Sequence, residues 1–113
     1  MNQINQTTIE QLTHQSANRG PVIVNRLTGA QIVFDDKRNT VSLHFPKLVG
    51  EFRNKFKTLE IKYNEATDLY DLQGYRINSN TFQVVTRFVE EGVYGDQLKS
   101  IVEQKTGLYL SLS

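Results

Sequence analysis

The chain has 113 residues, with 13 basic and 12 acidic side chains and no cysteine. This length suits a single domain, and the lack of thiols excludes disulfides, thiolate metal sites and a cysteine nucleophile. The apolar runs are only a few residues long, against about 20 for a membrane span, and residues 1–6 lack the pattern of a secretory signal. We therefore expect a cytoplasmic protein without a membrane partner.

The first 20 residues form a polar lead that contains seven asparagines and glutamines. Thr8 is placed to cap a short helix through about Asn18, which Arg19-Gly20-Pro21 would end. The apolar face of that helix is small, so disorder of the lead is an equal alternative. We expect residues 21–113 to form one domain.

Three strands are predicted next, over residues 22–24, 31–34 and 40–45, because β-branched and alternating apolar residues are concentrated there. The connections between them are short and turn-like. Short connections join antiparallel neighbours, so these strands are expected to form a meander.

A basic helix is predicted over residues 47–57. Pro46 suits a first helical turn, and Leu48, Phe52 and Phe56 recur at helical spacing. Beyond it the alternation of residues 59–63 favours a strand, although a helical register also persists there.

Residues 69–77 are also expected to be extended, and Gly74 is expected to mark a bulge. Asn80 and Gln83 have the spacing of a capping box, which predicts a helix over residues 80–91. Asp96 is expected to cap a further helix over 97–105, with Gly107 beyond its end, and residues 108–112 alternate as a strand. The predicted fold is α+β: a mostly antiparallel sheet of five to six strands, meander first, with two or three helices packed on one face.

No motif predicts a cofactor, a metal site or a catalytic residue. His14 and His44 lie in different elements without a third ligand near in sequence. Glu60-Ile61-Lys62, with Asp35 or Asp36 as a second carboxylate, has the form of a metal-dependent nuclease site. The same acid-spacer-lysine pattern occurs three times in the chain, so a solvated strand face is the favoured interpretation.

Two binding surfaces are predicted instead. Residues 1–58 carry a net charge of +4 and residues 59–113 one of −3, and a cluster of cations could neutralise phosphates or an acidic protein surface. A tyrosine-bearing segment and an uncharged C-terminal strand could form a protein interface or a homodimer by strand pairing. The basic patch consists of Lys37, Arg38, Lys47, Arg53, Lys55 and Lys57. The interface candidates are Tyr70, Tyr75, Leu108, Tyr109 and Leu110.

The leading functional hypothesis is a small, non-enzymatic binding or regulatory protein that acts on a protein partner. The alternative is a nucleic-acid-binding protein that uses the basic helix. A metal-dependent nuclease is the remote third hypothesis.

Overall fold

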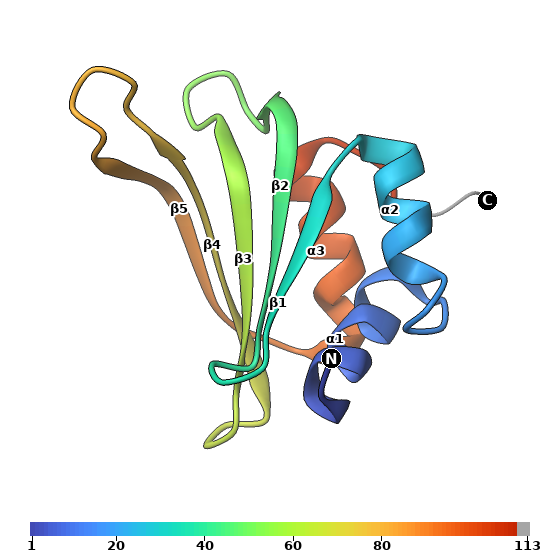
Figure 1. Cartoon of the computed structure of the whole chain (residues 1–113). Helices are drawn as coiled ribbons and strands as arrows, with labels where there is room; N and C mark the ends of the chain where they lie inside the picture. The colour runs from blue at the N-terminus through green and yellow to red at the C-terminus, as the bar shows by residue number, and fades with distance from the viewer. Residues whose placement is uncertain (111–113) are drawn as a thin grey trace.

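The computed structural model describes residues 1–110 (Figure 1). Two helices precede five strands, and a third helix follows them. In chain order the elements are α1 (Gln3–Thr13), α2 (Gly20–Thr28), β1 (Gln31–Asp35), β2 (Thr40–Val49), β3 (Phe56–Asn64), β4 (Leu69–Ile77), β5 (Val84–Val93), the 3-10 turn η1 (Gly95–Gln97) and α3 (Leu98–Thr106).

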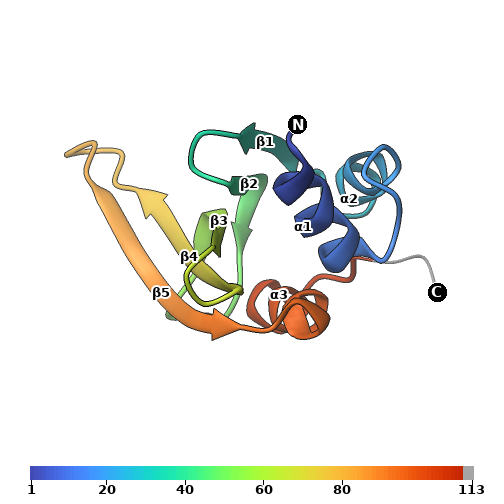
Figure 2. The ribbon, with the colours of Figure 1, turned by 90° about the horizontal axis from the view of Figure 1, so that it is seen from below.

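The five strands form one antiparallel sheet in the order β1-β2-β3-β4-β5, a simple meander. The sheet is strongly curved, and the helices lie on its concave side (Figure 2). The α+β class with a single antiparallel sheet is therefore confirmed. Among the described residues, no helix is long and apolar enough to cross a membrane.

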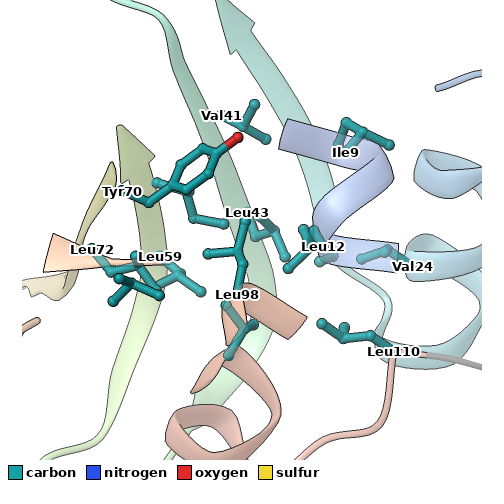
Figure 3. Close-up of a cluster of buried hydrophobic side chains, with 14 of the residues drawn as sticks. Ile9, Leu12, Val24, Val41, Leu43, Leu59, Tyr70, Leu72, Leu98 and Leu110 are labelled. Carbon is teal, nitrogen blue, oxygen red and sulfur yellow. The ribbon is translucent and has the colours of Figure 1, made fainter. Parts of the chain in front are cut away.

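The core lies between the concave face of the sheet and the helices (Figure 3). Leu43 and Leu59 come from the central strands, while Leu12 of α1 and Leu98 of α3 close the core from the helical side; all four are fully buried. Alternation along β2 and β3 places their polar residues on the opposite, convex face. That face has no helix over it (Figure 2).

The polar lead contains an ordered helix, but it begins five residues earlier than its predicted cap at Thr8. Asn2 is the N-cap, and its side chain accepts a hydrogen bond from the Asn5 N–H at 2.8 Å. Asn5 and Thr8 are buried polar residues. Sequence pattern alone underestimated this helix because part of its packed face is polar.

The predicted strand over residues 22–24 is wrong, since these residues belong to α2. Pro21 occupies the first helical turn, where its missing N–H costs nothing, and Gly29 ends the helix at φ 76°. Ile23 and Val24 are buried while Val22 is exposed. One-sided burial therefore overrides the β propensity of these branched residues.

The predicted basic helix over residues 47–57 is also wrong. Strand β2 continues to Val49, and β3 already begins at Phe56. The pairing of β2 with β3 is interrupted between His44 and Val49, so Pro46 sits where the ladder needs no N–H donor. The apolar residues at helical spacing therefore do not share one buried face, because Phe56 is buried and Phe52 is exposed.

The predicted helix over residues 80–91 is a loop followed by β5. The side chain of Asn78 accepts hydrogen bonds from the N–H groups of Asn80 and Thr81 at 2.9 and 3.3 Å. This local bonding organises a hairpin turn, which competes with helix capping for the same residue types. The β-branched residues after it then pair with β4.

The predicted strands over residues 31–34, 40–45, 59–63 and 69–77 are confirmed, and β4 has the predicted bounds. The register of β4 against β5 shifts at Gly74/Tyr75, but the extra residue is Arg87 on β5, so the irregularity predicted at Gly74 lies on the strand opposite it. Helix α3 begins at Leu98 and ends before Gly107, whose φ is 74°. Its cap was predicted wrongly, because Asp96 lies in η1 and the N-cap, Gln97, forms no side-chain capping bond.

Residues 108–110 form no strand in the structure. Leu110 is buried in the core, and its N–H donates a hydrogen bond to the Glu103 carboxylate at 2.9 Å. The rest of the predicted C-terminal strand lies outside the described residues.

Candidate functional site

Two hairpin loops lie next to each other at one end of the sheet, at the top of Figure 1. Because the meander alternates direction, the β2–β3 and β4–β5 connections must lie at the same end, opposite the β1–β2 and β3–β4 turns. We call residues 46–58 and 75–88, which form these two loops and the adjoining strand ends, the hairpin-end surface.

The hairpin-end surface exposes several large apolar side chains. Phe52 in the first loop is 89% exposed and Phe82 in the second is 81% exposed. Leu48, Ile77 and Val84 are exposed beside them on the strand ends. Single exposed apolar residues are common, but a group at one end of a small domain is typical of a contact surface.

Phe82 is also held in an unfavourable backbone conformation. Its φ is 58°, in the left-handed region that side chains with a bulky Cβ substituent avoid. The loop maintains it through two backbone hydrogen bonds, from the Phe82 N–H to the Asn78 carbonyl at 2.7 Å and from the Asn78 N–H to the Gln83 carbonyl at 2.8 Å. Such strain without any gain in burial is more often found at functional positions.

The two hairpins are linked by side chains at their base. The guanidinium of Arg87 on β5 donates a hydrogen bond to the carbonyl of Arg53 in the first loop. Phe56 and Phe88 stack edge to face with ring centroids 5.0 Å apart, and the ammonium of Lys105 lies 5.3 Å from the Phe88 ring centroid. The loops are therefore presented from a common, packed base.

A shallow hollow of about 370 Å³ joins the two hairpins. Leu48 of β2 and Ile77 of β4 contribute its apolar surface, and Lys57 and Arg76 contribute cations. Apolar groups from both hairpins thus line one concave feature, and basic groups lie beside them.

The charge of the hairpin-end surface is strongly positive. Its two segments contain six basic residues and one acidic residue, Glu51, whereas the rest of the chain has seven basic and eleven acidic residues. The molecule is therefore polarised along its strands, and not between the two halves of the sequence. The six cations are Lys47, Arg53, Lys55, Lys57, Arg76 and Arg87.

The structure divides the predicted basic patch. Four of its members, Lys47, Arg53, Lys55 and Lys57, lie in the hairpin-end surface. Lys37 and Arg38 lie in the β1–β2 turn at the other end of β2, about 30 Å away by the rise per residue of a strand. They cannot act as one patch with the other four.

The predicted protein-interface residues are dispersed as well. Tyr70 is 4% exposed and packs in the core, so it offers no surface for a partner. Tyr75 is half-buried on β4, Leu108 is half-buried, and Tyr109 is 79% exposed. Because Leu110 is buried and residues 108–110 form no strand, the described residues do not present the predicted edge for dimerisation.

Glu60 and Lys62 of the nuclease-like triplet lie on the convex face of the sheet, while Ile61 between them is buried in the core. Ser42 and Gln73 are directly across from Glu60 on the neighbouring strands, so neither predicted aspartate pairs with it. Asp35 accepts the N–H groups of the β1–β2 turn at 3.2 Å, and Asp36 accepts hydrogen bonds from Asn2 and Asn5.

Metal-binding groups are sparse in the described part of the chain. Within residues 1–110, no group of three or more histidine, aspartate or glutamate side chains is arranged to hold a metal ion. His14 ends α1, and His44 Nδ1 lies 3.2 Å from Thr58 Oγ1 on β3.

The sequence pattern did not identify residues 75–88 as part of the hairpin-end surface. The predicted helix over residues 80–91 would contain Phe82, Val84 and Arg87, and only the pairing of β5 with β4 reveals their place. Ile77 is in the predicted strand, but nothing in the sequence placed it in this surface. The available signal was the β-branched run after the polar 78–81 segment. No family model matches the chain, and no curated protein and no solved structure matches it.

Proposed function

We propose that this protein is a non-catalytic protein-binding module, and that the hairpin-end surface docks on an apolar, acidic surface of a partner protein. The observation that carries the proposal is the pair of exposed phenylalanines, Phe52 and Phe82, on adjacent hairpin loops. Aromatic anchors surrounded by arginine and other polar groups are the usual composition of a protein interface.

Charge complementarity specifies the partner further. A surface with six cations and one anion favours acidic groups around the apolar contact and accelerates association with them. The aliphatic groups Leu48, Ile77 and Val84 beside the phenylalanines favour a protein over a nucleic acid. Interfaces with nucleic acids are more polar, and their apolar contacts depend mainly on flat rings that stack on bases.

A photo-crosslinking experiment tests the proposal. Phe82 is replaced by a photoreactive phenylalanine analogue, and the full chain is irradiated in a native lysate treated with nuclease. The matched control carries the same analogue at Val22, which is exposed on α2, away from the hairpins. We expect one protein to crosslink at position 82 and not at position 22, at an apolar site flanked by acidic residues.

The captured partner is then purified and titrated with the unlabelled protein. Phe52→Ser together with Phe82→Ser should weaken binding at least tenfold, as expected for two anchor residues, while Val22→Ser leaves it unchanged. Rising salt should weaken it moderately.

Two further probes separate the other classes of partner. A single-stranded oligonucleotide and vesicles rich in phosphatidylserine are titrated at low salt. Saturable binding of either probe, weakened by Phe52→Ser with Phe82→Ser, overturns the protein-binding proposal. Absence of any position-specific crosslink at residue 82 also overturns it.

A further inference from the structure

A cavity of about 430 Å³ opens between α1, the β3–β4 turn and the connection from β5 to η1. The β3–β4 turn and the N-terminal part of α1 lie at the end of the sheet opposite the two hairpin loops (Figure 1), so the interpretation of this cavity does not depend on the function proposed above. Three tyrosines and two aspartates are among its lining residues, together with Gln3 and Gln11, and the most buried of the tyrosines, Tyr70, is only 4% exposed and contributes little of the surface. The tyrosines are Tyr63, Tyr70 and Tyr94, and the aspartates are Asp68 and Asp96.

The lining residues include acidic side chains and no basic ones. No lysine, arginine or histidine is among the lining residues, so no side-chain cation offsets the two carboxylates. Aromatic rings present a negative face, which attracts a cation at close range. A cation entering this cavity therefore meets carboxylates and aromatic side chains, whereas an anion would be repelled by the carboxylates.

Two of the rings are held in place before any ligand binds. Tyr63 and Tyr70 stack edge to face with centroids 5.4 Å apart, and the Tyr63 hydroxyl donates a hydrogen bond to the Asp68 carboxylate. That bond raises the pKa of Tyr63 to about 12, so the phenol remains neutral at ordinary pH. The Tyr70 hydroxyl lies 3.4 Å from Thr8 Oγ1 of α1 in a buried contact.

The third ring, that of Tyr94, is exposed to solvent. Tyr94 is 61% exposed and precedes η1, and Asp96 follows it in that turn. Both are lining residues beside α1, since a Cβ built at Gly95 between them would lie 3.1 Å from the Gln11 side chain. A packed pair of rings and an exposed ring in the same lining resemble the groups of aromatic side chains that surround an ammonium group in other binding sites.

We propose that this cavity binds an organic ammonium group, a primary or methylated amine carried on a short aliphatic chain. The volume is within the range of small-molecule sites. The aliphatic part would contact Ile4 and the tyrosine rings, and the charged end would lie near Asp68 and Asp96. The amine could come from a free metabolite or from a lysine side chain of another protein, because both present the same group.

Nuclear magnetic resonance of the full ¹⁵N-labelled chain tests the proposal with defined probes. Choline and n-butylammonium represent free amines, and the amide of Nα-acetyl-trimethyllysine represents a lysine side chain. The control is 3,3-dimethylbutan-1-ol, which has the shape of choline without its charge. We expect saturable shifts at the amides of Tyr94, Gly95 and Asp96 with the cations and none with the alcohol.

Variants on the exposed wall of the cavity then locate the site. Tyr94→Ala and Asp96→Asn should each weaken binding by about threefold to tenfold, as expected for a cation–π contact or a partly exposed charge. Tyr109→Ala and Glu10→Gln, which remove an exposed tyrosine and an exposed acid outside the lining, should leave it unchanged.

Each outcome of these titrations either identifies the source of the amine or contradicts the proposed site. Tighter binding of the lysine amide identifies a protein side chain as the source, and tighter binding of choline or butylammonium identifies a free amine. Absence of saturable shifts with every cation, equal binding of the alcohol, or equal weakening by the control variants overturns the proposal.

Discussion

Gly74 on β4 lies directly beneath the ring of Phe88 on β5, so closely that a Cβ built at Gly74 would be 2.3 Å from Phe88 Cε1. The same Cβ would lie 2.9 Å from the buried ring of Phe56. The missing side chain therefore lets two aromatic rings stack at the base of both hairpins. Next to this contact the register of the two strands shifts, and the extra residue is Arg87 on β5; such a bulge increases the local bend of a sheet.

We predict that Gly74→Ala destabilises the protein by about 1–3 kcal/mol, since the added methyl group forces one of two packed rings to move. Urea denaturation followed by circular dichroism measures the change in the free energy of unfolding. Gly95→Ala is the matched control, because its Cβ would meet only the end of the flexible Gln11 side chain at 3.1 Å. Equal losses in the two variants would contradict the close approach of Gly74 and Phe88.

The exposed phenylalanines should contribute nothing to stability. Phe82→Asn is expected to leave the free energy of unfolding unchanged or to raise it by less than about 1 kcal/mol, because asparagine tolerates the left-handed backbone better. Phe56→Ala, which empties a buried site, is expected to cost about 3–5 kcal/mol. A loss above about 1 kcal/mol in Phe82→Asn would mean that the ring serves the fold and not a partner.

Asp36 in the β1–β2 turn is predicted to make the free energy of unfolding depend on pH in the acid range. Asp36 accepts hydrogen bonds from the Asn2 backbone and from the Asn5 side chain, which lower its pKa below 3.8 in the folded protein. Because the folded state favours the carboxylate, this stabilisation is complete above pH 3.8 and is lost as the pH falls through the lowered value.

A pH series of urea denaturation curves checks this. Asp36→Asn should make the decline of stability at acid pH shallower than in the parent, and it should lower stability at neutral pH. Glu10→Gln, an exposed change on α1, is the control. An unchanged acid dependence in Asp36→Asn would rule out the proposed linkage.

Tyr63 is predicted to titrate last among the tyrosines whose pKa is raised. The hydrogen bond to Asp68 is the largest cause, and it raises the pKa of Tyr63 to about 12. The folded state holds this proton more tightly than the unfolded state, whose value is 10.0. The resulting stabilisation is therefore complete below pH 10 and lost as the pH rises through about 12.

Ultraviolet absorbance of tyrosinate measures this directly, because the chain has five tyrosines and no tryptophan. Asp68→Asn should shift one tyrosine to lower pH, and Tyr63→Phe should remove that same titration step. A step near pH 12 that persists in Tyr63→Phe would assign the raised pKa to another tyrosine.

Much of the sheet follows from local pattern. Residues 40–45 and 59–63 alternate strictly, so each side of these strands has one environment, and their short connections to neighbouring strands require antiparallel pairing. Gly107 also identified a helix end, because its left-handed backbone conformation makes a side chain costly. These features depend only on residues that are close in sequence.

The candidate sites depend on contacts that are distant in sequence. The run at 22–24 became helical because α1 and the sheet bury one side of it, and the phenylalanine spacing at 52 and 56 fits a helix as well as a hairpin. Only strand pairing decided between these alternatives, because local propensities differ by about 1 kcal/mol or less while burial of a single large side chain contributes more. The sequence by itself determined the class of the fold and the cations available, whereas the tertiary structure decided which of them lie beside Phe52 and Phe82.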